Sequence, residues 1–289
     1  MTATQTELDV ALPPRLFSCT PSRLTTWLDC PRRYRFSYVD RPSPPKGGAW
    51  AHNSMGAAVH VALASWWSLP LEERSPEAAG RLVRSRWQPA GFRDDAQSAA
   101  WRERAADMVE RYVAGLDPGD EPIGVERTVA LRTDRLALCG RIDRLDRRGD
   151  ELVVVDYKTG RHVLTTDDAR GSLALAVYAA AAARTLRRRC VRVELHHLPS
   201  GDVISWEHSD AALARQLGRI HDIAGEAVAA EQQAAQGDRD AAFPPRPGTM
   251  CGWCDFAAHC PEGQAASRRQ PAWAGLPLEV ESTVDDVLD

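Results

Sequence analysis

The chain has 289 residues, a formal net charge of −4 and a hydrophobic content of 44%. This content is ordinary for a globular protein and excludes wholesale disorder, and the length suits one large domain or a domain with an appendage. The net negative charge argues against a protein that coats nucleic acid by bulk electrostatics, but not against a local arginine-lined groove. The sequence lacks both a signal peptide and an apolar run of roughly 18 residues, so we expect a cytoplasmic protein with no membrane partner.

The N-terminal part combines a helix with a basic, aromatic segment. Residues 1–20 are expected to be a flexible lead-in, followed by a helix that ends near Cys30. Aromatic residues then alternate with Arg32, Arg33 and Arg35. This mixture suits a nucleic-acid backbone whose bases stack on rings. The alternative is that arginine stems pack over a surface aromatic cluster.

A second helix is predicted to begin near Asn53 and to run through Trp67. It carries His60 one turn after Gly56, on an apolar face. A lone histidine on such a face is usually a core residue, so the helix alone does not indicate a metal ligand. A helical insertion is expected at about 68–118.

Beyond this insertion the pattern changes to strands. The continuous apolar run at 152–155 predicts a strand that is buried on both faces. An alanine-rich helix follows it, then a hairpin and a polar-faced helix. The predicted ranges are strands 124–131, 136–143 and 151–157 with a turn at 147–150, helix 166–184, hairpin 191–207 and helix 209–236.

The hairpin at 136–157 brings charged residues together. Its turn sets Asp143 opposite or diagonal to Asp156, and like charges across a strand pair are destabilising, so a cation is expected between them. Alternation along the strand puts Lys158 on the side of Asp156 and Tyr157 on the other side. Only two of the 36 basic residues are lysines, and a lysine pKa shifts readily. The residues leave two alternatives open, a metal site and a buried Asp–Lys ion pair.

A second candidate site is the cysteine trio Cys251, Cys254 and Cys260. The two-residue spacing lets the first two thiolates meet one centre, but three ligands leave a tetrahedral or cubane site one short. Cys30 is the best candidate for the fourth ligand, and His259 is a nearby alternative. The spacing leaves a zinc ion and an iron–sulfur cluster equally open.

Taken together, these motifs resemble the RecB-type branch of the PD-(D/E)xK nuclease superfamily. The similarity is to exonucleases with an iron–sulfur cluster, such as the CRISPR-associated exonuclease of that type and the AddB nuclease domain. Five motifs occur in the family's order: the opening Ser-Arg-Leu…Cys-Pro-Arg-Arg-Tyr at 22–34, Gly-x-x-x-His at 56–60, Gly-Arg-Ile-Asp-Arg-Leu-Asp at 140–146, Asp-Tyr-Lys-Thr-Gly at 156–160 and the cysteine trio. The resemblance implies a mixed α/β fold with a restriction-endonuclease-like core. A central mixed sheet flanked by helices would carry a helical and iron–sulfur-bearing periphery, in one nuclease domain at 21–264 with an acidic flexible tail at 265–289.

The resemblance also implies roles for individual residues. His60, Asp143 and Asp156 would be metal ligands with a main-chain oxygen near Tyr157, and Lys158 would position the attacking water. The four cysteines at positions 30, 251, 254 and 260 would hold a 4Fe–4S cluster. Tyr178 matches the family's Gln-x-x-x-Tyr motif and joins the catalytic set, but Ala174 stands at the glutamine position. Two alternatives stay open: Ser172 or Arg170 substitutes for that glutamine, or the enzyme is slower or differently selective.

The function implied is that of an exonuclease dependent on Mg²⁺ or Mn²⁺, acting on single-stranded DNA in repair or recombination. Arg32, Arg33 and Arg35 would bind the DNA backbone. A separate helicase is expected as partner and no nucleotide cofactor, because no lysine follows a glycine as a phosphate-binding loop requires. The alternative is a catalytically decayed nuclease-fold module that binds DNA within a repair complex, which Ala174 alone favours.

Overall fold

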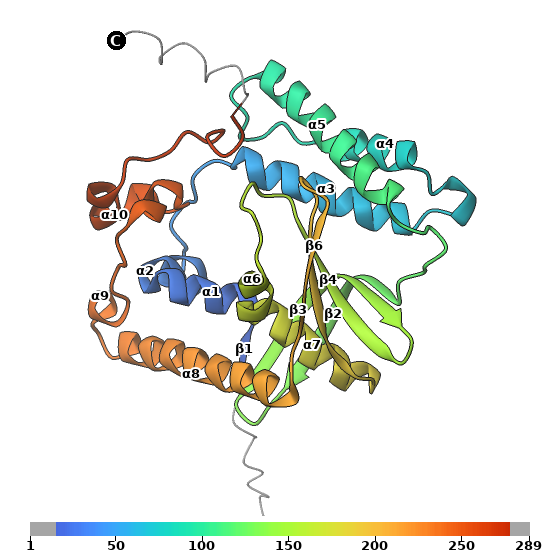
Figure 1. The fold of residues 1–289 in the computed structure, drawn as a ribbon. Helices are drawn as coiled ribbons and strands as arrows, with labels where there is room; N and C mark the ends of the chain where they lie inside the picture. Colours follow the sequence, from blue (N-terminus) through green and yellow to red (C-terminus); the bar gives the residue numbers. More distant parts are fainter. Residues whose placement is uncertain (1–15, 278–289) are drawn as a thin grey trace, which may run out of the picture.

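Helices cover both faces of a six-stranded mixed sheet in the computed structural model, which describes residues 16–277 (Figure 1). The expected fold class, with a central mixed sheet flanked by helices, is confirmed. The strands are β1 (Phe17–Cys19), β2 (Gly124–Arg132), β3 (Leu136–Arg148), β4 (Glu151–Lys158), β5 (Cys190–His197) and β6 (Asp202–Glu207). The longer helices are α1 (Pro21–Asp29), α3 (Ala51–Trp67), α4 (Pro76–Arg86), α5 (Asp95–Ala114), α7 (Leu173–Leu186) and α8 (Asp210–Ala235). Among the described residues, no helix is both long and apolar enough to span a membrane.

The long strand β3 divides one of its edges between two partners. β1 pairs in parallel with residues 136–138, and β4 pairs antiparallel with residues 144–148. β2 pairs along the opposite edge from Ala137 to Leu145. Residues 139–143 of β3 therefore lie between the end of β1 and the start of the β4 ladder, and Asp143 falls in this break.

Each face of β4 packs against a different group of helices, as the continuous apolar run predicted. Leu152 and Val154 belong to the cluster formed with α1, α7 and α8. Val153, Val155 and Tyr157 belong to the cluster formed with α3, α4 and α5. Because β4 is buried on both faces, its C-terminal end is held in a fixed position between the two helical layers.

The single helix expected over 166–184 is wrong in one respect, because the chain forms two helices there. α6 (Thr166–Gly171) ends at Ser172, whose backbone is extended at ψ 113°. Ser172 then caps α7, since its Oγ accepts the Leu175 N–H at 3.2 Å. A serine that bonds to nearby backbone favours such a helix boundary over a helix interior.

Other boundaries also differ from the expectations. β3 extends to Arg148, and Gly149, at φ +62°, makes a tight turn into β4. The basic, aromatic segment after Cys30 is helical. The short elements are α2 (Pro31–Tyr34), the π-helical turn η1 (Arg35–Val39), α9 (Arg239–Ala242), α10 (Pro261–Ala266) and the 3₁₀ turns η2 (Leu71–Glu73), η3 (Thr249–Trp253) and η4 (Ala257–His259).

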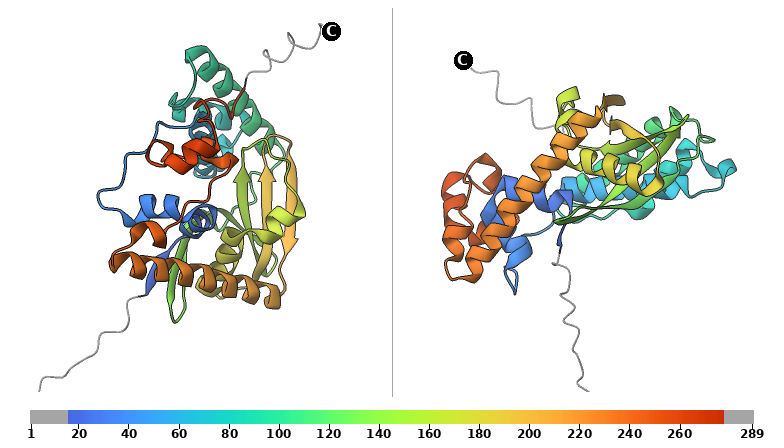
Figure 2. Two further views of the ribbon diagram at one scale, coloured as in Figure 1. Left: turned by 90° about the vertical axis from the view of Figure 1, so that its left-hand side faces the viewer. Right: turned by 90° about the horizontal axis from the view of Figure 1, so that it is seen from below.

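The C-terminal turns η3, η4 and α10 lie beside the N-terminal helices on one side of the molecule (Figure 2). Figure 2 shows the C-terminal turns beside α1 and α2, with α8 running along the same side. Residues 267–277, which were expected to belong to the tail, pack instead against α3 and α5. Leu276 is 2% exposed, and its carbonyl accepts from Gln97 Nε2 at 3.1 Å and Trp101 Nε1 at 3.0 Å. Residues 1–15 of the predicted lead-in and 278–289 of the predicted tail lie outside the described residues.

Candidate functional site

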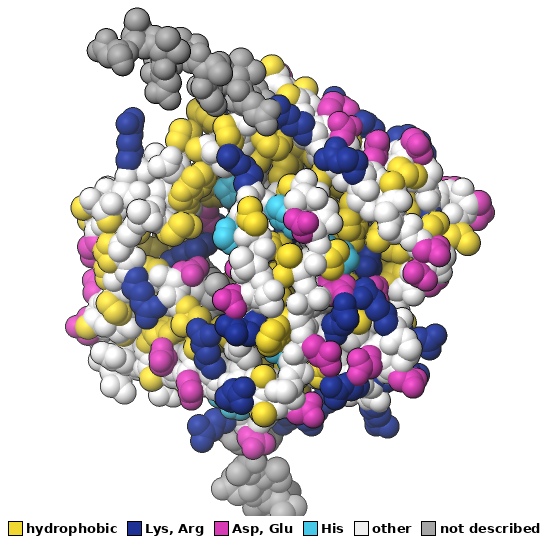
Figure 3. Space-filling model, in the orientation of Figure 1, with side chains coloured by type: hydrophobic (Ala, Val, Ile, Leu, Met, Phe, Trp, Pro, Cys, Tyr) yellow, Lys and Arg dark blue, Asp and Glu magenta, His cyan; other side chains and the backbone are white. Residues whose placement is uncertain are grey.

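A cleft of about 820 Å³ opens where β4 ends beneath α3. Of the residues singled out in the sequence, His60, Asp143, Tyr157 and Lys158 line it. The space-filling view shows the surface hollowed on this side, with histidine and acidic side chains in the hollow (Figure 3). The sequence motifs from α3 and from the β3–β4 hairpin therefore converge on one cavity.

A glycine sets the distance between α3 and the end of β4. A Cβ added to Gly56 would lie 3.2 Å from Thr159 Oγ1, which is tighter than ordinary van der Waals contact. One turn further along α3, His60 Nδ1 lies 3.4 Å from Asp143 Oδ2. The Gly-x-x-x-His spacing thus brings the helix close enough for its imidazole to reach the carboxylate of β3.

Asp143 occupies the break in the pairing of β3. Its Oδ2 accepts the Tyr157 N–H at 2.9 Å, in place of a backbone partner. The Arg144↔Val155 register, extended by one residue, sets Asp143 opposite Asp156, as the hairpin predicted. The strands stop exchanging backbone bonds at the position where the two carboxylates face each other.

Asp156 and Lys158 form an ion pair on one side of β4, and Tyr157 is buried on the other side, as the alternation predicted. Burial raises the pKa of Asp156, Lys158 opposes this effect, and the Asp143 carboxylate adds to it. The Asp–Lys ion pair left open by the sequence is therefore present. The Lys158 side chain is 44% exposed, so its ammonium group also reaches the cleft.

Glu126 of β2 is a site residue that sequence reasoning missed. His60, Glu126 and Asp143 each offer one ligand atom, and these atoms lie within 4.8 Å of one another. The β2–β3 register sets Glu126 opposite Asp143, and Glu126 has a left-handed backbone at φ +48°. No local spacing links the two residues, because only the strand register brings them together.

This set of donors suits a small, hard cation. Ligands that share one such cation lie within about 4–5 Å of one another, since metal–oxygen distances are about 2.0–2.6 Å. Burial raises the pKa of Glu126, and the Asp143 carboxylate raises it further although Arg141 opposes both effects. Burial lowers the pKa of His60, but the hydrogen bond to Asp143 and the nearby carboxylates outweigh it and raise the pKa overall. The residues therefore fit Mg²⁺ or Mn²⁺, whose charge would relieve the repulsion among the carboxylates.

Tyr178 of α7 lies against the same break in β3. A Cβ on Gly140 would lie 2.3 Å from Tyr178 Cε1, so only glycine admits the ring. Burial and the carboxylates of Asp156 and Asp143 raise the pKa of Tyr178 to about 12. The two residues expected to replace the missing glutamine are engaged elsewhere: Ser172 caps α7, and Arg170 pairs with Asp167 at 2.8 Å.

The four cysteines expected to share a ligand all line one small cavity of about 70 Å³ between α1, α2 and the C-terminal turns. They are Cys30, Cys251, Cys254 and Cys260. All are free thiols, and the Arg246 N–H donates to Cys30 Sγ at 3.4 Å. His259, the alternative fourth ligand, is bonded to the Pro45 carbonyl at 3.1 Å and is not among the residues lining the cavity.

The arginines expected to bind DNA are engaged in ion pairs around this cysteine cavity. Asp240 Oδ1 lies 2.7 Å from Arg35 Nη1 and 3.5 Å from Arg32 Nη2. Arg33 Nη1 lies 3.5 Å from Asp29 Oδ2. In the metal cleft, the arginines that line the wall are instead Arg141 and Arg161, which the sequence did not single out.

A family comparison accounts for the cleft. The model of the PD-(D/E)XK nuclease superfamily matches residues 18–261. The chain belongs to this superfamily. Membership in the PD-(D/E)XK nucleases implies a phosphodiester hydrolase that acts on nucleic acid with divalent metal ions. The matched range contains His60, Glu126 and Asp143 of the cleft and all four cysteines of the cysteine cavity. No curated protein matches the chain.

Proposed function

We propose that this PD-(D/E)XK nuclease is an exodeoxyribonuclease that degrades single-stranded DNA in repair or recombination, using Mg²⁺ or Mn²⁺. The observation that carries the proposal is the approach of His60, Glu126 and Asp143 to within 4.8 Å beside the Asp156–Lys158 pair. The exonuclease activity and the strand preference rest on the resemblance of the motifs to RecB-type enzymes. Cytoplasmic action beside a separate helicase belongs to the same proposal.

Each residue has a role in the proposed hydrolysis. His60, Glu126, Asp143 and Asp156 hold the cation, with the main-chain oxygen of Tyr157 as a further ligand. When bound, the cation supplies Lewis-acid polarisation of the phosphoryl group and lowers the pKa of water. Lys158 Nζ, held beside Asp156 and exposed to the cleft, orients the attacking water. Tyr178 packs beside both aspartates as the remaining member of the set.

Phosphate binding in the cleft falls to two arginines. Arg141 Nε lies 2.6 Å from Glu126 Oε2, so it connects the metal ligands to the wall of the cleft. Arg161 follows Lys158 closely in the chain and lines the same cavity. Guanidinium groups bind phosphate oxygens in a bidentate manner, and these two are placed to align the backbone with the metal centre. The arginines first expected to contact DNA do not line this cleft. They are Arg32, Arg33 and Arg35, whose ion pairs lie around the cysteine cavity.

The test is degradation of end-labelled single- and double-stranded DNA with Mg²⁺, Mn²⁺ or EDTA. Asp156→Ala and Lys158→Ala are expected to lose at least about a hundredfold in rate. Lys46→Ala, at the only other lysine, and Asp150→Ala, in the exposed hairpin turn, are the matched controls and keep wild-type rates.

The missing glutamine at Ala174 favours one competing function, a decayed nuclease fold that only binds DNA. This reading gains support because Ser172 and Arg170 are engaged elsewhere. If wild type and both variants bind DNA equally and none cleaves it, the binding module is correct and catalysis is refuted.

We also propose that the cysteine cavity holds a 4Fe–4S cluster. Two observations support it: four cysteines line one cavity, and no three of their sulfurs form a group within 4.8 Å among the described residues. Thiolates around one tetrahedral zinc lie roughly 3.8 Å apart, given a Zn–S distance of about 2.3 Å. A cluster of four irons holds its four thiolates farther apart, and the resemblance of the motifs to exonucleases with an iron–sulfur cluster favours it over zinc.

The cluster proposal is tested on protein purified without oxygen. We expect a brown protein with iron and sulfide in equal amounts, whereas Cys251→Ser loses both. Cys139→Ser, a thiol that does not line the cavity, is the control and keeps them. A colourless protein with stoichiometric zinc would refute the cluster and leave the nuclease proposal intact.

A further inference from the structure

A second pocket lies at the end of the sheet opposite the metal cleft. β6 runs antiparallel to β5, so its last residue, Glu207, pairs with Arg192, whereas Lys158 pairs with His197 at the cleft end. The pocket has a volume of about 590 Å³ and shares no lining residue with the cleft. In Figure 1, β6 continues directly into α8 at this end. The lining residues are Arg170, Trp206, Glu207, His208, Ser209, Ala212, Arg215, Gln216 and Arg219.

The charge of this pocket, which we call the α8 pocket, is positive. Arg215 and Arg219 are exposed, one turn apart on α8, and form no ion pair with any residue in the described range 16–277. Arg170 lies over the Trp206 ring, 5.7 Å from its centroid, and is paired with Asp167, so it adds less charge than the other two arginines. The first turn of the 26-residue helix α8 adds partial positive charge, which Asp210 in the same turn partly offsets. Glu207 is the acidic residue of the lining, and Arg189 Nη2 lies 3.6 Å from its carboxylate.

Three polar side-chain atoms of the α8 pocket are buried and have no hydrogen-bond partner among the described residues. They are Trp206 Nε1, His208 Nε2 and Gln216 Oε1. His208 is only 1% exposed. Gln216 Nε2 donates to the Arg170 carbonyl at 3.3 Å, which leaves the Gln216 carbonyl oxygen as the unpaired acceptor. Buried polar groups are nearly always paired, so the unpaired Trp206 N–H and Gln216 carbonyl oxygen in one basic pocket point to a ligand that pairs them.

We propose that the α8 pocket binds the phosphate group of a nucleotide, supplied either free or as part of a DNA strand. Arg215 and Arg219 bind phosphate oxygens, because guanidinium–phosphate hydrogen bonds are charge-assisted and directional. The Trp206 indole N–H donates to the same group. Gln216 Oε1 accepts from a hydroxyl of the ligand, which a nucleotide sugar provides. This site is independent of the proposed catalysis, since it needs neither the metal nor the cleft.

The test follows the indole N–H signals of ¹⁵N-tryptophan-labelled full-length protein by NMR, in EDTA so that the metal cleft stays inactive. Trp206→Phe identifies the Trp206 signal among those of the nine tryptophans. The probes are inorganic phosphate, deoxyadenosine 5′-monophosphate, a 5′-phosphorylated single-stranded oligonucleotide and uncharged deoxyadenosine. We expect the phosphorylated nucleotide or the oligonucleotide to shift the Trp206 signal, and deoxyadenosine to leave it in place. If the nucleotide and the oligonucleotide both shift the signal, a free nucleotide is sufficient for binding. If only the oligonucleotide shifts it, the ligand is a DNA strand.

Matched variants then separate the pocket from general charge. Arg215→Gln/Arg219→Gln is expected to raise the dissociation constant at least about tenfold. Arg86→Gln/Arg111→Gln removes two exposed arginines of α4 and α5 and is expected to leave it unchanged. The proposal is overturned if no probe moves the Trp206 signal at about 10 mM. Deoxyadenosine binding as well as its phosphate, or unchanged affinity in the Arg215 and Arg219 variant, overturns it too.

Discussion

Glu126 shows how a single residue completes the metal centre. A non-glycine residue with φ near +48° is uncommon and costs free energy, so the surrounding structure must hold it in place. The unusual backbone occurs opposite Asp143, where the Glu126 carboxylate comes within ligand distance of Asp143 and His60. The strained position and the ligand set thus coincide.

Glu126→Gln is expected to weaken Mn²⁺ binding by roughly tenfold or more, because a charged ligand becomes a neutral one. Calorimetric titration of the variant with Mn²⁺ measures this directly. The matched control is Glu151→Gln on β4, whose carboxylate likewise lies 2.7 Å from an arginine nitrogen, that of Arg189, but outside the ligand group. Equal affinity in the two variants would exclude Glu126 as a ligand.

Gly140→Ala is expected to destabilise the protein by about 1–3 kcal/mol, because the new Cβ would force the Tyr178 ring from its place. Urea denaturation measures the loss in free energy of unfolding. Gly218→Ala in α8 is the control: a Cβ there meets nothing within 4 Å, and alanine favours a helix. If Tyr178 causes the loss, Gly140→Ala costs much less in a Tyr178→Ala background.

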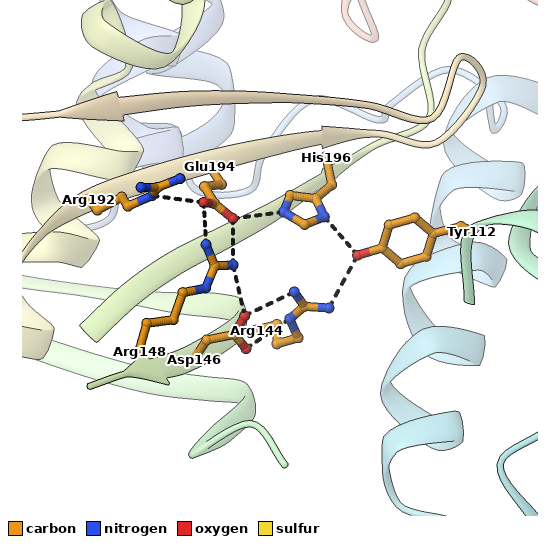
Figure 4. Close-up of polar contacts among 7 residues, drawn as sticks. All are labelled: Tyr112, Arg144, Asp146, Arg148, Arg192, Glu194 and His196. Carbon is orange, nitrogen blue, oxygen red and sulfur yellow. Dashed lines mark hydrogen bonds and ion pairs between the residues drawn. The ribbon is translucent and has the colours of Figure 1, made fainter. Parts of the chain in front are cut away.

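At the scale of elements, a buried polar network ties β3, β5 and α5 together on the face of β4 that carries Tyr157 (Figure 4). Glu194 of β5 is 1% exposed and accepts from Arg148 Nη1 at 2.6 Å and Arg192 Nε at 2.9 Å. His196 continues the network, 3.1 Å from Glu194 and 2.8 Å from the Tyr112 hydroxyl. The network holds β5, which pairs in parallel with β4, in place. It therefore also fixes the position of the C-terminal end of β4.

Glu194→Gln is expected to cost about 1–3 kcal/mol in free energy of unfolding at pH 7, because the buried carboxylate loses its charge-assisted hydrogen bonds with two half-exposed arginines. Burial acts to raise the pKa of Glu194, but the hydrogen bonds from His196 and Arg148 outweigh it and depress the pKa far below its usual range. The charged form therefore stabilises the fold fully above the unfolded pKa of about 4.3, and this stability is lost as the pH falls toward the folded pKa.

Denaturation of wild type and Glu194→Gln at several pH values measures the loss in free energy of unfolding and the direction in which it changes with pH. The difference between them is expected to be constant from pH 7 to 5 and to shrink below about pH 4.3. Glu207→Gln on the adjacent strand, where the side chain is 62% exposed, provides the comparison and changes little at any pH. A difference that grows as the pH falls would contradict the proposed role of Glu194.

At the scale of the whole molecule, residues 267–277 connect the cysteine cavity with the metal cleft. The segment leaves α10 beside the cysteines, and its Gly275 and Leu276 line the wall of the cleft. A Cβ on Gly275 would lie 2.7 Å from His52 Nδ1, so the segment is fitted closely to α3. Residues 267–277, which we call the strap, therefore connect the two candidate sites.

Leu276→Ala is expected to lower the free energy of unfolding by about 2–5 kcal/mol, because it leaves a cavity beside α5. It is also expected to slow metal-dependent cleavage, since the wall of the cleft loses its anchor. Thermal unfolding and the DNA degradation assay measure the two effects. Leu71→Ala, at a leucine that is 54% exposed, should leave both unchanged. Full activity in a destabilised Leu276→Ala protein would show that cleavage does not depend on the packing of the strap.

Local patterns made much of the centre of the molecule predictable. The apolar run at 152–155 specified a strand buried on both faces, because apolar residues at every position suit neither a half-exposed strand nor a turn. The two-residue period of the strand then placed Asp156 and Lys158 on one side and Tyr157 on the other. The hairpin turn predicted Asp143 opposite or diagonal to Asp156, and the observed strand register sets the two residues opposite each other.

Contacts between distant segments decided the rest. Glu126 joined the ligand group only through the register of β2 on β3, and the strap at 267–277 was assigned to a tail because its apolar partners lie on α3 and α5. Arg32 and Arg35 looked free in the sequence, yet Asp240, some 200 residues away, neutralises them. The sequence by itself determined the nuclease motifs and the strand that carries Asp156 and Lys158, because periodicity and turn chemistry act over a few residues. Only the tertiary structure decided which acid completes the metal centre and which arginines line the cleft, because register and packing join residues whose separation leaves no trace in local spacing.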